Sequence, residues 1–265
     1  MKKSVKKIIS IFAVVALIAG VFAACSSQKE ETEPQQQDTN GKTWTIAMDT
    51  VFKPFEYTDA EGNFVGIDVD IINAIAKDQG INIKINSIGW DAAIAACKAG
   101  QADGMIAGAS ITDERKQSGW IFSDPYYTAA QCAVVAKDSN VTSFDDLKGA
   151  NIAVKTGTQG ASYAESLAEQ YDFKLTYFED SPTMYQAVAG GQCTACFEDT
   201  PIIAAEIKDG TYALKIVEGT ENEGAGYGFA IFNTDNQELI DAFNAGLKNI
   251  KANGTYDEIL AKYLG

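Results

Sequence analysis

The chain has 265 residues, 46% of them hydrophobic, which is enough for one large or two medium-sized domains. It carries 21 basic residues, 36 acidic residues and no histidine. The acidic balance argues against nucleic acid and anionic membrane surfaces as partners, and the lack of histidine excludes histidine-based catalytic triads and metal sites.

The first 24 residues have the layout of a secretory signal. Four lysines precede an apolar run over residues 8–24, which ends in small residues directly before Cys25. A cysteine at this place resembles a bacterial lipoprotein site, although Phe22 stands where leucine is usual. We therefore expect cleavage and lipidation of Cys25, with an uncleaved anchor as the alternative. Without residues 1–24, 17 of the 21 basic residues remain against 36 acidic ones, a net charge of −19.

Residues 26–41 are polar, contain proline and glycine, and have no apolar periodicity. This composition predicts a disordered tether, so we expect residues 25–42 to hold the folded part at the outer face of the membrane.

Residues 43–107 predict alternating strands and helices. Strands are expected at 43–49, 81–85 and 101–107, with helices after Gly66 and Gly89 that end at glycines. This alternation is typical of a parallel α/β sheet, whose ligands bind at the carboxyl ends of the strands. Asp49, Trp90 and the stretch 107–115 fall there. We interpret Asp68 and Asp70 as a helix cap and a first-turn acid, not as catalytic carboxylates.

Arg115 is the only arginine in the chain, since every other cationic side chain is lysine. A planar, permanently charged fork suits bidentate recognition of a carboxylate. Gly108 permits close approach of a ligand to the backbone, and Ser110 adds a hydroxyl. The alternative is a surface arginine in a short helix capped by Thr112.

The second half of the chain repeats the plan. A strand at 151–155 leads through a glycine turn at 156–160 into a helix, an arrangement that suits an anion but lacks the lysine of a nucleotide P-loop. A strand at 173–178, a helix capped by Ser181 with Pro182 as its first residue, and a strand ending at Glu198 and Asp199 follow. A strand at 227–232 and two helices close the chain.

Four cysteines remain after Cys25. Cys193 and Cys196 form a lone C-x-x-C within an expected strand, which is a weak zinc signal. Buried free thiols are favoured for these two, as for Cys97 and Cys132, and a disulfide stays open. We expect no metal and no cofactor.

Seven stretches jointly carry a resemblance: DTVFKPFEY, GIDVDII, AGASITDERK, FSDPYY, VKTGTQ, EDTP and NGTYDEI. With them, the mature chain resembles the bacterial solute-binding proteins for polar amino acids, and most closely their glutamine-binding members. The resemblance implies a type II periplasmic-binding-protein fold, with parallel or mixed sheets flanked by helices. Lobe 1 would be 43–125 plus 228–265, lobe 2 would be 131–222, and two hinge strands would lie at 126–130 and 223–227.

The resemblance also implies a ligand site. By matching position, Arg115 would hold the α-carboxylate, helped by Ser110 and the backbone at Thr158. Asp199 and the Gly108 carbonyl would take the α-ammonium. The remaining expected ligand-binding residues are Asp49, Phe52, Trp90, Ala107, Lys155 and Gln159. Phe52 and Trp90 would flank the stem of the ligand, while Asp49 and Lys155 would meet its distal polar group.

Lys155 would repel a cationic ligand side chain and Asp49 an acidic one, which favours glutamine. Glu198 departs from the glutamine-binding pattern, which has histidine there, and cystine or a cationic amino acid stays an alternative. From other classes, a small-molecule lyase or a sensory domain is possible on the same fold. No kinase or channel segment is recognisable, so we expect a monomeric, non-enzymatic transport component. Its partners would be the transmembrane subunits of an ABC importer and the membrane, through the lipid on Cys25.

Overall fold

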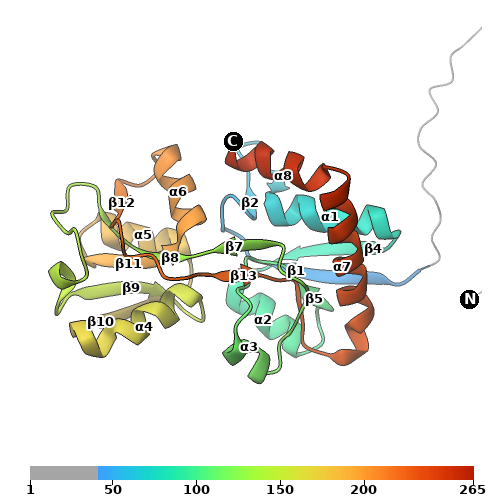
Figure 1. The fold of residues 1–265 in the computed structure, drawn as a ribbon, viewed down its shortest axis with the longest axis horizontal. Helices are drawn as coiled ribbons and strands as arrows, with labels where there is room; N and C mark the ends of the chain where they lie inside the picture. The colour runs from blue at the N-terminus through green and yellow to red at the C-terminus, as the bar shows by residue number, and fades with distance from the viewer. Residues whose placement is uncertain (1–40) are drawn as a thin grey trace, which may run out of the picture. The chain divides into compact units, whose positions relative to one another are not determined.

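A computed structural model describes residues 41–265, so the expected signal, Cys25 and most of the tether lie outside the described residues. Residues 43–265 form two five-stranded α/β sheets (Figure 1). The expected class, parallel or mixed sheets flanked by helices, is confirmed. Within the part of the chain that the structure describes, none of the helices has the length and apolar character needed to cross a bilayer.

The first sheet has the strand order β4-β1-β5-β14-β6. Its second strand β1 is parallel to its neighbours β4 and β5, whereas β14 is antiparallel to its neighbours β5 and β6. The strands are β1 (Thr43–Met48), β4 (Asn82–Ser87), β5 (Gly104–Met105), β6 (Ile121–Phe122) and β14 (Ala230–Ile231).

The second sheet has the order β10-β9-β11-β8-β12, with β10, β9 and β11 parallel and β8 antiparallel to β11 and β12. Its strands are β8 (Gln131–Ala136), β9 (Asn151–Lys155), β10 (Lys174–Phe178), β11 (Ala195–Asp199) and β12 (Leu214–Ile216). Two further ribbons pair β7 (Tyr127–Ala129) with β13 (Ala225–Tyr227), and β2 (Tyr57–Thr58) with β3 (Phe64–Val65).

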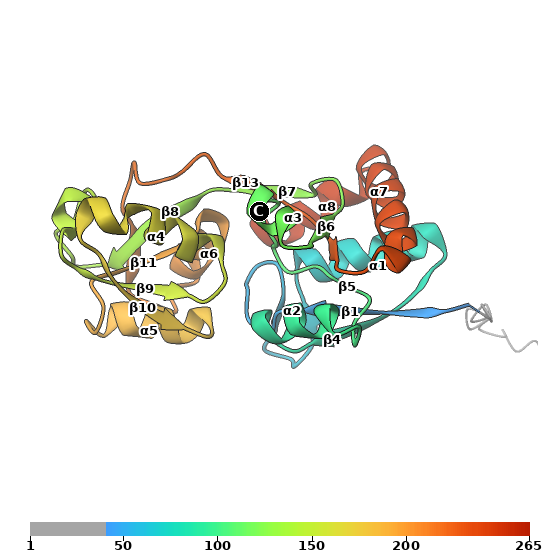
Figure 2. The ribbon, with the colours of Figure 1, turned by 90° about the horizontal axis from the view of Figure 1, so that it is seen from below.

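Helices cover both faces of each sheet (Figure 2). The helices that flank the first sheet are α1 (Ile67–Gln79), α2 (Trp90–Lys98), α7 (Gln237–Ala252) and α8 (Thr255–Leu264), with the short α3 (Asp113–Gln117) near its edge; those of the second are α4 (Gln159–Tyr171), α5 (Ser181–Ala189) and α6 (Thr200–Asp209). Short 3₁₀ turns lie at Asp145–Leu147 and Thr234–Asn236.

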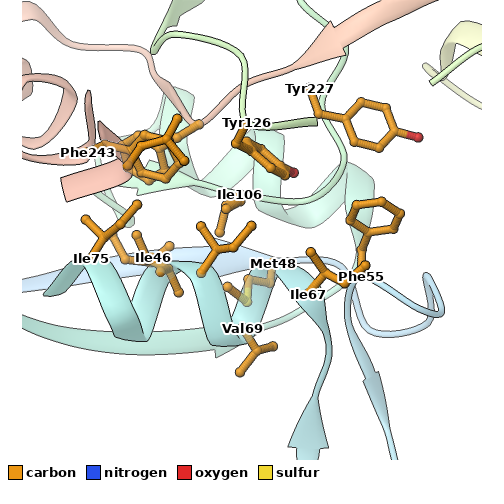
Figure 3. Close-up of a cluster of buried hydrophobic side chains, with 14 of the residues drawn as sticks. Ile46, Met48, Phe55, Ile67, Val69, Ile75, Ile106, Tyr126, Tyr227 and Phe243 are labelled. Atoms are coloured by element: carbon orange, nitrogen blue, oxygen red, sulfur yellow. The ribbon is translucent and has the colours of Figure 1, made fainter. Parts of the chain in front are cut away.

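Each sheet has a hydrophobic cluster on either face. The largest packs β1 against α1, α7 and α8, with Ile46, Ile75 and Phe243 fully or almost fully buried (Figure 3). The opposite face is covered by the alanine-rich α2. In the second sheet, α5 covers one face and α4 the other. Because apolar helix faces pack against both faces of each sheet, the ends of the strands are held in fixed positions.

Two expected caps are wrong. Asp68 lies in the first turn of α1 but does not cap it, because its carboxylate is buried and accepts hydrogen bonds from the Gly108 N–H and the Tyr126 hydroxyl, both 2.9 Å away. Asp180, not Ser181, caps α5 and accepts from the Thr183 N–H at 2.8 Å. An ionised carboxylate is a stronger acceptor than a hydroxyl, so the helix begins one residue earlier than expected.

Two expected strands are much shorter than the sequence suggests. The stretch 101–107 is regular only at β5, and 227–232 splits into β13 and β14. At the break, the Gly228 N–H donates to the Ala109 carbonyl and the Phe229 N–H to the Ser123 hydroxyl. These partners outside the ladder satisfy the backbone without regular strand pairing. The four described cysteines are buried and free, as favoured above, although Cys193 precedes β11 instead of lying within it.

Candidate functional site

A cavity lies where the carboxyl ends of strands from both sheets meet. All eleven residues that the sequence singled out line it, and Glu198 is added to them. The lining residues are Asp49, Phe52, Trp90, Ala107, Gly108, Ser110, Arg115, Lys155, Thr158, Gln159, Glu198 and Asp199.

The fold brings these residues together through its strand ends. Asp49 directly follows β1, Ala107 and Gly108 follow β5, Lys155 ends β9, and Asp199 ends β11. The first residues of two helices, Trp90 of α2 and Gln159 of α4, complete the wall. Parallel strands end at one edge of a sheet, so residues far apart in sequence gather there.

Arg115 is buried, with 7% of its surface exposed. Its Nη1 donates to the Ser110 carbonyl at 2.9 Å and its Nη2 to the Gly157 carbonyl at 3.1 Å. The rings of Trp90 and Trp120 lie 5.2 and 5.0 Å from the guanidinium carbon. Burial lowers the pKa of Arg115 to about 10, against the attraction of Asp199, so it stays cationic at neutral pH. This burial excludes the alternative of a solvated surface arginine.

Asp199 is held from both sides. The Tyr227 hydroxyl donates to its Oδ2, and Gln131 Nε2 donates to its Oδ1 at 2.6 Å. Asn222 in turn fixes the Gln131 amide at 2.8 Å. Burial raises the pKa of Asp199, while the bonds from Tyr227 and Gln131 and the charge of Arg115 oppose that rise. The carboxylate is therefore pre-oriented by residues of β8 and β13 before any ligand arrives.

Lys155 and Asp49 form a buried ion pair across the cavity. The Nζ–Oδ2 distance is 2.5 Å, and the two side chains are 4% and 6% exposed. Lys155 belongs to the second sheet and Asp49 follows the first, so the pair joins the two. The Lys155 Nζ also lies 5.4 Å from the Phe52 ring centroid. Burial excludes the alternative that Lys155 is merely solvated at a strand end.

Gly108 has no room for a side chain. Its φ of +56° favours glycine, and a Cβ there would lie 2.4 Å from Cε1 of Phe52. The backbone at this point is therefore packed directly against the Phe52 ring. Thr158 lines the cavity and caps α4: its hydroxyl accepts from the Ala161 N–H at 3.2 Å and donates to the Lys155 carbonyl at 2.8 Å.

Glu198 was treated above as a departure from a pattern, not as a site residue. Strand alternation would put it on the face opposite Asp199, but β11 ends at Asp199, where α6 begins, and both side chains reach the cavity. Glu198 Oε2 accepts from the Ser181 hydroxyl at 3.0 Å and the Tyr185 hydroxyl at 2.7 Å, and Oε1 accepts from the Asp199 N–H. Burial and the neighbouring Asp199 raise the pKa of Glu198 to about 7.

The cavity thus offers a cation and an anion, Arg115 and Asp199, as one set of polar partners, and the Asp49–Lys155 pair as another. Phe52 and Trp90 supply apolar surface. The Trp90 indole N–H is buried without a hydrogen-bond partner among the described residues. Across residues 41–265, no group of three side chains suited to a metal ion is found. The arrangement can hold a small zwitterion with a polar tail.

Comparison with known proteins agrees with this architecture. The model of the "Bacterial extracellular solute-binding proteins, family 3" matches residues 44–265. A probable histidine-binding protein of Neisseria gonorrhoeae is 32% identical over 255 residues, covering 96% of this chain and 94% of the relative.

Two solved proteins have related structures. An ancestral arginine-binding protein, solved with arginine and with glutamine, is 33% identical, with TM-scores of 0.77 and 0.76 over 84% of this chain and 98% of that one. The second substrate-binding domain of Lactococcus lactis GlnP, in an open conformation, is 39% identical with a TM-score of 0.58, over 84% of this chain and 96% of that one. The fold is thus the type II periplasmic-binding-protein fold, and the chain belongs to the bacterial extracellular solute-binding proteins, family 3.

Proposed function

We propose that this protein is the extracytoplasmic binding component of an ABC importer and captures a polar amino acid, with glutamine favoured. The observation that carries the proposal is the cavity itself, in which a buried Arg115 and a buried Asp199 face a second charged pair, Asp49 and Lys155.

The amino-acid head is bound by Arg115 and Asp199. Two of the five N–H donors of Arg115 are used by the Ser110 and Gly157 carbonyls, which leaves three for the ligand α-carboxylate. Asp199 and the Gly108 carbonyl accept from the α-ammonium. A zwitterion satisfies both charges at once, so neither is left buried without a partner.

The ligand side chain meets Asp49 and Lys155. A carboxamide offers both a donor to Asp49 and an acceptor to Lys155, whereas a cationic tail would be repelled by Lys155. Phe52 and Trp90 flank the aliphatic stem. The ancestral relative was solved with glutamine bound, which supports glutamine as a ligand that this fold accepts.

A cationic amino acid or cystine is the second candidate. Relatives described as histidine- and arginine-binding favour a cationic ligand, and so does the charge count of the cavity. When Glu198 is ionised, three carboxylates face two cations, and a positive side chain would balance them. A second zwitterionic head, as in cystine, would pair with Asp49 and Lys155.

Binding closes two lobes about a hinge. Lobe 1 is 43–125 plus 228–265 and lobe 2 is 131–222, with hinge strands at 126–130 and 223–227, the segments that contain β7 and β13. Contacts across the cavity, Lys155 with Asp49 and Arg115 with Gly157, support a closed form. The higher TM-scores with the ligand-bound relative than with the more identical open domain support the same arrangement. A ligand that contacts both lobes only in the closed form binds that form more tightly than the open form, and its binding therefore shifts the protein toward closure.

The closed protein delivers its ligand to the membrane-spanning subunits of the importer. A lipid on Cys25 and the tether 25–42 keep the monomer at the outer face of the membrane. Lyase and sensory functions on the same fold are the rival classes, and the cavity favours binding because Asp199 and Glu198 already accept at least two hydrogen bonds each.

The test is calorimetry and thermal shift of the purified protein with each common amino acid and cystine. Glutamine at 100 times its Kd should add about 2.7 kcal/mol to the unfolding free energy and raise the Tm, and it should be recovered unchanged. A large shift with arginine or cystine and none with glutamine would reverse the preference. No shift with any amino acid would contradict the proposal, and turnover of the ligand would favour the lyase.

A further inference from the structure

Two carboxyl groups, Glu56 and Asp68, lie side by side and are fully buried, next to the cavity-lining residue Gly108. Three of their oxygens have no donor among the described residues: both of Glu56, and Oδ1 of Asp68. The other oxygen of Asp68 accepts from the Gly108 N–H and the Tyr126 hydroxyl. Buried carboxylate oxygens without donors are costly, so this arrangement calls for an explanation.

A proton held between the two groups supplies it. Ionised carboxylates are acceptors only, so two of them form a hydrogen bond with each other only when one is protonated. Asp68 already has two donors and is the better-stabilised anion, which assigns the proton to Glu56, with its O–H donating to Asp68 Oδ1.

The surroundings favour that proton. The charged groups that face Glu56 are Asp68, Asp49 and Lys155, and Lys155 is already paired with Asp49. Tyr126 faces Asp68 as a neutral hydroxyl, since burial raises its pKa well above the usual value. Burial first, and then the charge of Asp68, raise the pKa of Glu56 well above its ordinary range, and burial raises that of Asp68 to about 6.

The pair connects three parts of the site. The Glu56 backbone exchanges hydrogen bonds of 2.7 and 3.1 Å with Phe52, whose ring lines the cavity. Asp68 holds the Gly108 peptide, and Tyr126 directly precedes the strand β7, beside the hydrophobic cluster of Figure 3. We propose that Glu56 and Asp68 form a proton-sharing pair of positioning residues that fixes the Phe52 and Gly108 walls of the ligand site. This inference rests on the proposed function only where ligand affinity is measured; the infrared and stability measurements do not need a ligand.

Glu56→Gln and Asp68→Asn test the pair, with Glu61→Gln as the matched control because Glu61 is exposed on the same segment. In Glu56→Gln the amide still donates to Asp68 but carries no titratable proton. At pH 7 Glu198 is also partly protonated, so the readout is a difference spectrum: Glu56→Gln should lose one component of the wild-type protonated-carboxyl band, and Glu61→Gln should keep the whole band. Asp68→Asn removes an anionic acceptor with two donors, and glutamine affinity should fall about tenfold or more.

The pH dependence of unfolding gives a second readout. The folded state holds the Glu56 proton more tightly than the unfolded chain, so stability falls as pH rises above the ordinary carboxyl pKa of about 4.3 and until the folded pKa is passed. Between pH 5 and 9, the Tm of Glu56→Gln should therefore decline less than that of the wild type, while Glu61→Gln follows the wild type. Glu198 adds a slope of the same sign to every variant, so the difference between Glu56→Gln and the wild type isolates the Glu56–Asp68 pair.

The outcomes separate the two proposals. If the wild type binds no glutamine but the infrared band and the Tm difference appear, the pair stands and the ligand assignment fails. The positioning role is supported if two results occur together. At pH 6 the affinity of Glu56→Gln for glutamine should be within about threefold of the wild-type affinity, and the Glu56 component of the infrared band should be missing. A Glu56→Gln protein whose protonated-carboxyl band is undiminished relative to the wild type, and whose Tm slope is that of the wild type, would overturn the pair, whatever it binds.

Discussion

Replacing Arg115 by alanine is the perturbation with the largest expected effect on ligand binding. The side chain is 7% exposed, and its charge is the cation that the α-carboxylate meets in the proposed complex. Truncating one member of a buried, hydrogen-bonded charge pair costs about 2–5 kcal/mol, and each 1.4 kcal/mol is a factor of ten in Kd. Arg115→Ala should therefore weaken glutamine binding roughly 30- to several-thousand-fold.

The size of the affinity loss within that range depends on which groups lose a partner in Arg115→Ala. The Ser110 and Gly157 carbonyls lose their donors, and the ligand carboxylate is buried without a cation. Arg115→Lys keeps the charge but not the planar fork, and its loss should be smaller than that of Arg115→Ala. Lys116→Ala is the matched control, because the neighbouring lysine has a side chain that is 52% exposed. Its affinity should stay within about twofold of the wild type.

Calorimetry with glutamine and with its decarboxylated analogue, 4-aminobutanamide, assigns the loss to one contact. If Arg115 holds the carboxylate, the alanine variant loses affinity for glutamine while its affinity for the analogue changes little, which gives a large coupling energy. Equal losses for both ligands would mean that Arg115 supports the cavity without touching the carboxylate. An unchanged glutamine affinity in Arg115→Ala would refute the charge-pair reasoning altogether.

Three further predictions concern ligand specificity and the fluorescence change on ligand binding. Lys155→Met removes the cation that repels a basic tail and leaves Asp49 free, so arginine affinity should rise relative to glutamine affinity in competition calorimetry; an unchanged ratio would contradict the assigned role. Because burial raises the pKa of Glu198 to about 7, deprotonation above pH 7 adds negative charge, and the arginine-to-glutamine affinity ratio should rise between pH 6 and 8.5 in the wild type but stay flat in Glu198→Gln. Trp90 lines the cavity, whereas Trp44 is packed in the core and Trp120 lies behind Arg115, so the ligand-induced fluorescence change should be strongly reduced in Trp90→Phe and persist in Trp44→Phe; the reverse pattern would place the ligand elsewhere.

The sequence predicted α1, α2, α4, α5 and the two C-terminal helices, whereas α6 was not expected. A glycine ends α1 in the left-handed conformation, Thr112 caps the short helix that contains Arg115, and the apolar face of α7 packs on α1. These features depend on contacts within a few residues, which a local pattern records. Strand ends were less predictable because partners such as the Ser123 hydroxyl, distant in sequence, replace ladder bonds there.

The lining of the cavity was predicted from strand ends and from family resemblance, but its supporting bonds were not. Nothing near Asp199 in the sequence indicates that Tyr227 and Gln131 hold it, since both come from other strands. Asp68 was interpreted as a helix-terminal acid for the same reason. Its partners Gly108 and Tyr126 are 40 and 58 residues away, and only the fold brings them together. Buried polar networks depend on tertiary contact, so a helix-start pattern cannot distinguish a cap from a network member.

The central claim is that one amino acid is held by Arg115 at its carboxylate and by Asp199 at its ammonium. A crystal structure of the protein grown with glutamine measures this directly. The account predicts carboxylate oxygens within about 3 Å of the Arg115 guanidinium, the ammonium at Asp199 and the carboxamide between Asp49 and Lys155. A ligand bound outside this cavity, or one whose carboxylate lies beyond hydrogen-bond distance of Arg115, would contradict it.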